Sequence, residues 1–186
     1  EGTIRQVLAV DRREEANMEQ RRGELNNMSR KGTSKPRLVE PDLVYGSRLV
    51  TKLINRSMFD GKKSVAKREV YKAFEIVKEK TETDPLKVFN QALDNIRPTM
   101  EVRPRRIGGA AYQVPQAVRG VRKDSLAIRW LIAAANSRSN SELHTYADKL
   151  STEIMEAAKG EGTAVRKRTE MERVAEANKA FAHFRW

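Results

Sequence analysis

The chain has 186 residues, enough for one compact domain with appendages, and carries 37 Lys and Arg against 25 Asp and Glu, a net charge of +12. A charge of this size points to a polyanionic partner, nucleic acid or an anionic membrane surface. The absence of cysteine excludes disulfides and thiolate metal sites, and no apolar run approaches the ~20 residues of a membrane span. We therefore expect a soluble, intracellular, polyanion-binding protein.

The first part of the chain differs from the rest. Residues 1–27 hold six acidic and five basic side chains, and their apolar content is too thin for a well-packed helix. Because Met28 looks like a fresh protein start, residues 1–27 are interpreted as an appended segment of unassigned role. Residues 28–41 are expected to form a basic tail that is too polar to bury but able to order on phosphate, an idle tail being the alternative. The remainder, residues 42–186, reads as a helical domain.

Three helical patterns come first in that domain. Asp42 is expected to cap the first helix, which ends before the Asp60-Gly61 turn signal. The second covers residues 62–81, and the third begins at Asp84-Pro85 and is stopped by Pro98. The apolar stripes expected to face the core are Leu43, Leu49, Val50, Leu53 and Ile54; Ala66, Val70, Phe74 and Val77; and Leu86, Phe89, Leu93 and Ile96.

A β-ribbon at about residues 100–119 interrupts the helices. Two β-capable runs flank Gly108-Gly109, and glycine takes positive φ without steric cost, so a hairpin is predicted. Pro104 and Pro115 each remove a ladder donor, which requires exposed or edge-like strands. Residues 97–123 contain seven Lys and Arg but only one acidic residue, Glu101. So basic a ribbon cannot be buried. We interpret it as an arm that projects onto a polyanion, with a solvated surface hairpin as the alternative.

Three further helices are predicted after the ribbon. Asp124 or Ser125 is expected to cap the fourth, and Ser139-x-x-Glu142 reads as a capping box for the fifth, which ends at Gly160. The sixth begins near Gly162-Thr163. Its first turns are cationic, which opposes the helix dipole, so that cluster is unlikely to serve helix stability. The inward side chains are expected to be Leu126, Ala127, Trp130, Leu131 and Ala134; Leu143, Ala147, Leu150, Ile154 and Ala157; and Met171, Val174, Asn178 and Phe181.

Nothing in the sequence predicts an enzyme. Gly61-Lys62-Lys63 lacks the upstream glycine and the following Ser or Thr of a phosphate-binding loop. The two histidines, His144 and His183, have no second ligand at metal spacing, so no catalytic residue, metal or cofactor is expected. The fold class expected is mainly α: a six-helix domain with a protruding basic β-hairpin and a basic N-terminal tail.

Four stretches resemble a known family. RPRRIGGAAYQVP in the ribbon, DGKK at Asp60–Lys63, AIRWLI at Ala127–Ile132 and the C-terminal NKAFAHFRW are similar to bacterial small-subunit ribosomal protein number seven, and the likeness runs from Met28 to Trp186. The resemblance implies a cytoplasmic, non-enzymatic protein that binds the 3′ major domain of rRNA, nucleates assembly of the subunit head and contacts neighbouring head proteins. It also implies a ribbon near the exit-site tRNA and the mRNA exit channel. Some members of the family repress translation of their own messenger.

The residues expected to bind rRNA are cations in three patches and one turn. Lys and Arg contacts to phosphate supply affinity, and contacts to RNA shape or splayed bases supply selectivity. The set is Arg30, Lys31, Lys35 and Arg37 in the tail; Lys62 and Lys63; Arg103, Arg105, Arg106, Arg119, Arg122 and Lys123 in the ribbon; and Arg166, Lys167 and Arg168 in the last helix. The ribbon tip expected near tRNA and mRNA is Ile107, Gly108, Gly109, Ala110 and Tyr112. Tyr112 either stacks on a base or packs on the ribbon's own apolar side.

Two other classes of protein remain open from the residues alone. An architectural DNA-binding protein could use the same basic arm in a minor groove, and competition between structured rRNA and duplex DNA would separate it from an RNA binder. An RNA-modifying enzyme would need a cofactor loop or catalytic constellation that the chain does not display. No membrane or small-molecule substrate is expected as a partner.

Overall fold

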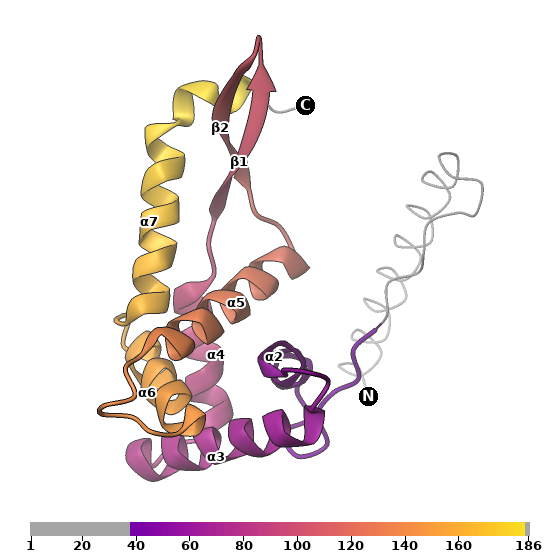
Figure 1. Cartoon of the computed structure of the whole chain (residues 1–186), viewed down its shortest axis with the longest axis vertical. Coiled ribbons are helices and arrows are strands. Elements are labelled where there is room, and N and C mark those ends of the chain that lie inside the picture. Colours follow the sequence, from indigo (N-terminus) through magenta and orange to yellow (C-terminus); the bar gives the residue numbers. More distant parts are fainter. Residues whose placement is uncertain (1–37, 185–186) are drawn as a thin grey trace, which may run out of the picture. The chain divides into compact units, whose positions relative to one another are not determined.

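The structure is a computed structural model, and it describes residues 38–184. The chain divides after Leu38, and the fold below belongs to the unit that follows. Its elements are the helices α2 (Arg48–Ser57), α3 (Lys63–Thr81), α4 (Pro85–Ile96), α5 (Val121–Ser137), α6 (Tyr146–Ala158) and α7 (Thr163–Ala177), the strands β1 (Met100–Ile107) and β2 (Ala110–Ala117), and a closing 3₁₀ helix, η1 (Lys179–Phe184). The mainly α fold with one antiparallel hairpin is confirmed (Figure 1).

Helices α2 to α6 enclose a single apolar core. Phe74 of α3 lies against Phe89 of α4 with ring centroids 5.4 Å apart, and Tyr45 meets Phe74 edge-on at 5.0 Å. Trp130 of α5 also belongs to this cluster and is 9% exposed, which confirms its expected place in the core. The expected stripes of α3 and α5 are buried throughout, because residues three or four positions apart lie on one helical face.

The first helix starts later than expected. Its N-cap is Ser47, whose hydroxyl accepts from the Leu49 amide, whereas Asp42 accepts from the Val44 and Tyr45 amides in a separate turn. The prediction that Leu43 faces the core is therefore wrong, since that side chain lies in the turn and is 91% exposed. An Asp before an apolar run is compatible with a turn as well as with a helix cap. In both, its carboxylate can accept hydrogen bonds from the amides two and three residues later in the chain.

Two other helix starts also differ from expectation. Helix α5 begins at Val121 after Gly120 instead of at Asp124 or Ser125. The capping box of α6 is not Ser139 with Glu142: Thr145 accepts from the Asp148 amide while Asp148 accepts from the Thr145 amide. Leu143 consequently lies in the loop before α6 and is only half-buried. Both motifs satisfy the S/T-x-x-acid spacing, so the spacing alone does not distinguish them.

The hairpin forms as predicted around its two glycines. Gly108 and Gly109 have φ of 57° and 89°, the positive values that a two-residue turn matched to the strand twist requires. The register pairs Ile107 with Ala110 at the turn and Met100 with Ala117 at the base. With only two strands, both are edges, so the prolines at positions 104 and 115 are accommodated.

The base of the hairpin is fastened to the helices by a buried carboxylate. Glu101 of β1 is 6% exposed. Its Oε1 accepts from Arg103 Nε at 2.7 Å, and its Oε2 accepts from Arg122 Nε, on α5, at 3.1 Å. Burial opposes the charged form, but the hydrogen bonds from the two arginines outweigh it and lower the pKa of Glu101. Arg103 and Arg122, two of the cations expected to bind rRNA, are therefore engaged with a carboxylate of the protein itself.

Helix α7 and η1 support one side of the hairpin along its length. Thr99 donates from its amide and hydroxyl to Glu172 of α7, at 3.0 and 2.8 Å. Farther out, Val114 is fully buried, and the ring of Tyr112 lies 5.0 Å from that of Phe181. The ribbon thus stands on a helical support instead of projecting as a bare arm (Figure 1).

Candidate nucleic-acid interface

The cations of the chain are not equivalent once the fold is known. Among residues 38–184, the side chains of Arg105, Arg106, Arg119 and Lys123 make no ion pair or hydrogen bond within the protein. Phosphate binding needs such groups, because a cation already paired with a carboxylate releases that partner at a cost. The expected ribbon patch therefore consists of four available cations and two that hold Glu101.

The hairpin register decides where its arginines point. Directly paired residues share a face of the sheet, so Arg103 and Arg105 share a face with their partners, the buried Val114 and the half-buried Tyr112. Arg106 pairs with Ala111 and lies on the opposite face, where both residues are exposed. Arg106 is consequently the tip cation with the freest approach to a polyanion.

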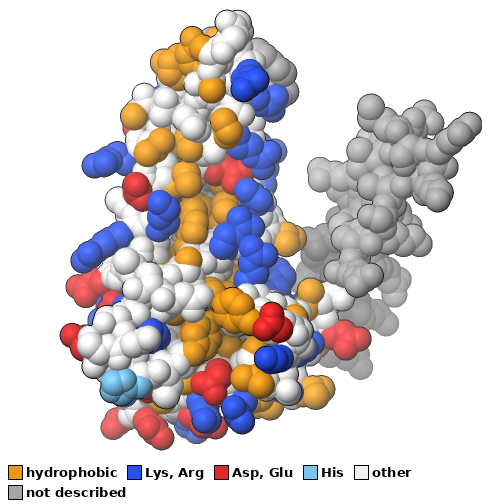
Figure 2. Space-filling model, viewed as in Figure 1, with side chains coloured by type: hydrophobic (Ala, Val, Ile, Leu, Met, Phe, Trp, Pro, Cys, Tyr) orange, Lys and Arg blue, Asp and Glu red, His pale blue; other side chains and the backbone are white. Residues whose placement is uncertain are grey.

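The available cations continue from the hairpin onto α5 and α2. Asp124, in the first turns of α5, accepts from Arg97 at 2.9 Å and lies 3.6 Å from Lys52 of α2. These contacts bring the start of α5, with Arg119 and Lys123 beside it, against α2. Figure 2 shows a column of Lys and Arg side chains along this side of the molecule, the side away from α7.

Sequence reasoning missed part of this surface. Arg48 and Arg56 on α2 are exposed and, with Lys52 between them, recur every four residues on one helical face. Arg129 on α5 is exposed as well and has no ion pair among residues 38–184. The four-residue spacing of cations on α2 was the available signal, but it stood beside an apolar stripe that explained the helix without it.

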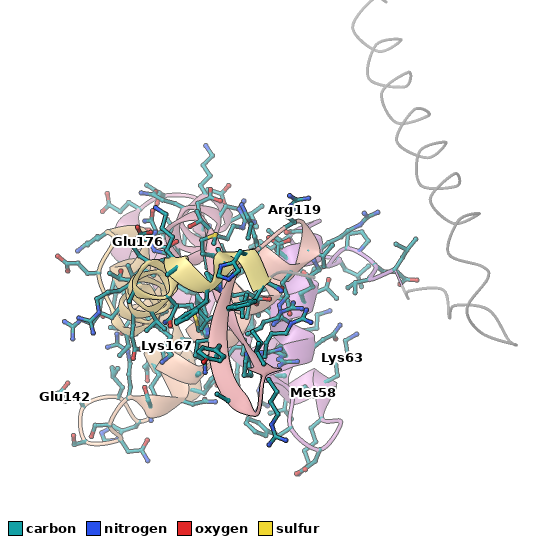
Figure 3. The ribbon with its side chains drawn as sticks, turned by 90° about the horizontal axis from the view of Figure 1, so that it is seen from above. Met58, Lys63, Arg119, Glu142, Lys167 and Glu176 are labelled. Atoms are coloured by element: carbon teal, nitrogen blue, oxygen red, sulfur yellow. The ribbon has the colours of Figure 1, made fainter. Side chains whose placement is uncertain are left out.

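The turn between α2 and α3 adds two more cations. Lys62 and Lys63 are exposed, and their side chains have no partner in the part of the chain that the structure describes. The turn is closed by hydrogen bonds from the Lys62 amide to the Phe59 carbonyl at 2.9 Å and from the Lys63 amide to the Gly61 carbonyl at 2.8 Å. Figure 3 labels Lys63 and Arg119 on one side of the molecule, opposite Glu142 and Glu176.

The expected patch on the last helix is largely occupied. Lys167 pairs with Glu170 at 2.7 Å, and Arg168 donates to the Asn95 carbonyl at the end of α4, also at 2.7 Å. Arg168 therefore satisfies a carbonyl that the helix end leaves open. Of the three residues, Arg166 alone has a side chain without an ion pair or hydrogen bond among residues 38–184.

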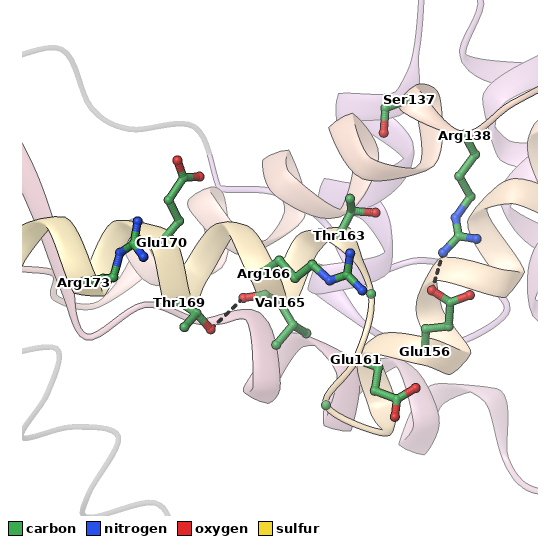
Figure 4. Close-up of a pocket in the computed structure, with 12 residues that line it drawn as sticks. Ser137, Arg138, Glu156, Glu161, Thr163, Val165, Arg166, Thr169, Glu170 and Arg173 are labelled. Carbon is green, nitrogen blue, oxygen red and sulfur yellow. Dashed lines mark hydrogen bonds and ion pairs between the residues drawn. The ribbon is translucent and has the colours of Figure 1, made fainter.

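The start of α7 is also closed to an anion. The fully buried Glu153 of α6 accepts from the Ala164 amide at 2.9 Å and from Arg138 Nη2 at 2.5 Å, so a carboxylate already caps this helix. Beside it lies an open cleft of about 980 Å³, in which Arg166 extends toward the loop carrying Glu161 (Figure 4). Its charged lining is balanced between Arg138, Arg166 and Arg173 and Glu156, Glu161 and Glu170. A balanced cleft offers a polyanion little net attraction.

Tyr112 lies in an aromatic cluster, with Phe181 at 5.0 Å and Phe184 at 6.2 Å between ring centroids. This contact is with η1, an alternative to the base stacking or ribbon packing expected from sequence. The remaining tip residues, 107–110, form the turn itself. The tail cations Arg30, Lys31, Lys35 and Arg37 lie outside the described residues.

Residues 38–184 contain neither a metal-binding cluster nor a membrane-spanning helix. No group of three or more His, Asp or Glu side chains there could hold a metal ion. No helix among these residues is both long enough and apolar enough to cross a membrane.

Comparison with known proteins gives one consistent family. The family described as "Ribosomal protein S7p/S5e" matches residues 29–179. The chain is similar to proteins named "Small ribosomal subunit protein uS7" from three bacteria. It is 54% identical to that of Carboxydothermus hydrogenoformans over 159 residues, 86% of this chain and 100% of the relative. It is 51% identical to that of Beijerinckia indica over 159 residues, 86% of this chain and 100% of the relative. It is 52% identical to that of Thermosipho africanus over 157 residues, 84% of this chain and 99% of the relative.

Proposed function

The chain belongs to the ribosomal protein S7p/S5e family, and from this premise we propose that, as a structural constituent of the small ribosomal subunit, it binds the 3′ major domain of the rRNA and nucleates assembly of the subunit head. This role is non-enzymatic and belongs to the ribosomes of the cytoplasm. It rests on affinity for RNA phosphates, which a one-sided cationic surface provides without any catalytic group.

One observation carries the proposal: Lys and Arg side chains form a column on the side of the molecule away from α7 (Figure 2). Arg119 and Lys63 belong to separate segments of the chain, yet both lie on the side opposite Glu176 of α7 (Figure 3). Because phosphate contacts at separate points add approximately, such a surface gives both affinity and orientation. The basic tail extends the same chemistry, and Arg166 is assigned a minor share.

The finer placement of the hairpin is also proposed. Its tip stands at the far end of the ribbon from the helical core (Figure 1), so the core can bind rRNA while the tip contacts another ligand. We assign the tip to the exit-site tRNA and the mRNA exit path, with neighbouring head proteins around it, as the family resemblance implies. Repression of the protein's own messenger is a further role implied by that resemblance.

The test is crosslinking of the protein within purified small subunits. The proposal predicts crosslinks from the α2–α3 turn and from Arg119 to the 3′ major domain, and crosslinks from the hairpin tip to tRNA or mRNA. In a parallel competition, structured rRNA should displace the protein from duplex DNA. Crosslinks confined to another rRNA domain, or preference for duplex DNA, would contradict the proposal.

A further inference from the structure

An apolar pocket opens beside the α2–α3 turn. It has a volume of about 240 Å³, and its walls include Phe59, Val65 and Ala66. Phe59 is 70% exposed and Val65 45% exposed, although both are large apolar side chains. Single exposed apolar residues are common, but these two line the same pocket.

A hydrogen-bonded turn fixes the backbone that carries the aromatic ring. The backbone carbonyl of Phe59 accepts a hydrogen bond from the Lys62 amide at 2.9 Å, and the backbone between them takes positive φ at Asp60 (50°) and Gly61 (73°). Figure 3 labels Met58 and Lys63 at the two ends of this segment, on the side of the candidate interface. A ring on a short, hydrogen-bonded turn loses little conformational freedom when a ligand stacks on it.

The floor and rim of the pocket carry polar groups. Ser57 and Tyr146 hydroxyls lie 2.9 Å apart, and because one proton serves this bond, the other remains available to a ligand. Burial raises the pKa of Tyr146, so the phenol keeps its proton at neutral pH. Glu69 at the rim has its Oε1 3.6 Å from Arg68 Nε and supplies its other carboxylate oxygen as an acceptor.

Charge and size select the occupant. Residues 56–69 contain five Lys and Arg and two acidic residues, and Lys62 forms part of the pocket wall. Drug-sized ligands fill roughly 300–1,000 Å³, so this pocket suits one smaller planar group. An apolar slot with an exposed aromatic ring, with Lys62 in its wall and Lys63 next in the chain, matches an unpaired nucleotide, whose phosphates meet the lysines while the base stacks.

We propose that this pocket takes a single unpaired base of the rRNA, stacked on Phe59, while Lys62 and Lys63 contact its phosphates. The carboxylate of Glu69 favours a base with an exocyclic amino group, adenine, cytosine or guanine, over uracil. This inference rests on the proposed rRNA binding and adds a base-specific contact to a surface otherwise described by charge alone.

The test compares full-length variants on a fragment of the rRNA 3′ major domain. Phe59→Ala removes the stacking ring, and Leu43→Ala is the control, since Leu43 is also a largely exposed apolar residue and lies in another turn. Phe59→Ala should weaken binding by roughly tenfold, because base–aromatic stacking contributes that order of affinity, and should leave the salt dependence unchanged. Leu43→Ala should bind as the wild type does. Thermal unfolding verifies that both variants are folded.

A photocrosslinking analogue placed at Phe59 distinguishes the occupants. Within the assembled small subunit it should label one rRNA nucleotide that bears an exocyclic amino group. Labelling of a neighbouring protein, or equal affinities for the Phe59→Ala and Leu43→Ala variants, would overturn the base pocket while leaving rRNA binding intact. If the wild type itself shows no salt-dependent binding to the fragment, the proposed function fails, and the pocket assignment fails with it.

Discussion

Replacing Glu101 by glutamine tests how the hairpin is held. The two are nearly isosteric, but glutamine keeps only one oxygen and turns an NH₂ group toward a guanidinium. The wild-type carboxylate accepts four N–H bonds or close contacts, from Arg103 at 2.7 and 2.6 Å and from Arg122 at 3.1 and 3.0 Å. Each charge-assisted hydrogen bond contributes roughly 1.5–3 kcal/mol.

The net loss is smaller than the sum of these bonds. The side chains of Arg103 and Arg122 are 52% and 46% exposed, so water can accept some of the hydrogen bonds that the carboxylate no longer accepts. We expect the Glu101→Gln substitution to lower the free energy of unfolding by about 2 kcal/mol at neutral pH. Urea unfolding of the full-length variant, followed by circular dichroism, measures it.

The loss should depend on pH in one direction. Because the folded pKa of Glu101 is lowered, its contribution is fully present above the unfolded value of about 4.3 and disappears as pH falls through the folded value. Wild type and variant should therefore differ above pH ~5 and converge in more acid solution. Glu142→Gln, at an exposed loop residue without an ion pair among residues 38–184, is the control and should change nothing. A difference between wild type and the Glu101→Gln variant that persists undiminished to pH 3 would falsify the charge-based account.

Three other perturbations follow from the packing. Trp130→Ala should cost about 3–5 kcal/mol in thermal or urea unfolding and weaken rRNA binding only through unfolding; lost binding with unchanged stability would place the indole on RNA instead. Gly162→Ala should lower the free energy of unfolding by about 2–3 kcal/mol, because φ is 91° and the new Cβ would lie 3.0 Å from Glu153 Oε1. Gly160→Ala, at φ 85° with open space around it, should cost only the backbone strain. Equal losses of stability in the two variants would contradict the steric argument. Replacing residues 105–112 by a short glycine linker should leave a folded protein, since Glu101 and Val114 remain. This variant should enter small subunits but retain exit-site tRNA poorly. If the folded variant fails to enter small subunits, the hairpin is a main rRNA anchor.

Local sequence patterns were sufficient to predict the helices and the hairpin but not the residue at which each helix begins. The stripes of α3 and α5 and the Gly108-Gly109 turn were predictable because spacing and glycine chemistry act within a few residues. The start of α6 was not, since two motifs there have the spacing of a capping box and the spacing alone does not distinguish them.

The candidate interface was predictable as composition but not as a surface. A count of charges cannot distinguish Arg106, which has no ion pair among residues 38–184, from Arg103, which binds the buried carboxylate of Glu101 together with Arg122. The partner of Arg168 is a backbone carbonyl of Asn95, and backbone groups leave no trace in a residue pattern. The exposure of Phe59 likewise depends on the turn between α2 and α3 that carries it.

The salt dependence of rRNA binding tests the central claim most directly. With ~6 phosphate contacts, the log–log slope of affinity against salt should be near −4 to −5 for the wild type. Alanine at four interface cations, Arg105, Arg106, Arg119 and Lys123, should make the slope shallower by about 3. The control removes the same charge from exposed lysines on α3 and α4, Lys72, Lys78, Lys80 and Lys87. Its slope should match the wild type. Equal losses of slope in both variants would show that net charge, and not the surface that the fold assembles, binds the RNA.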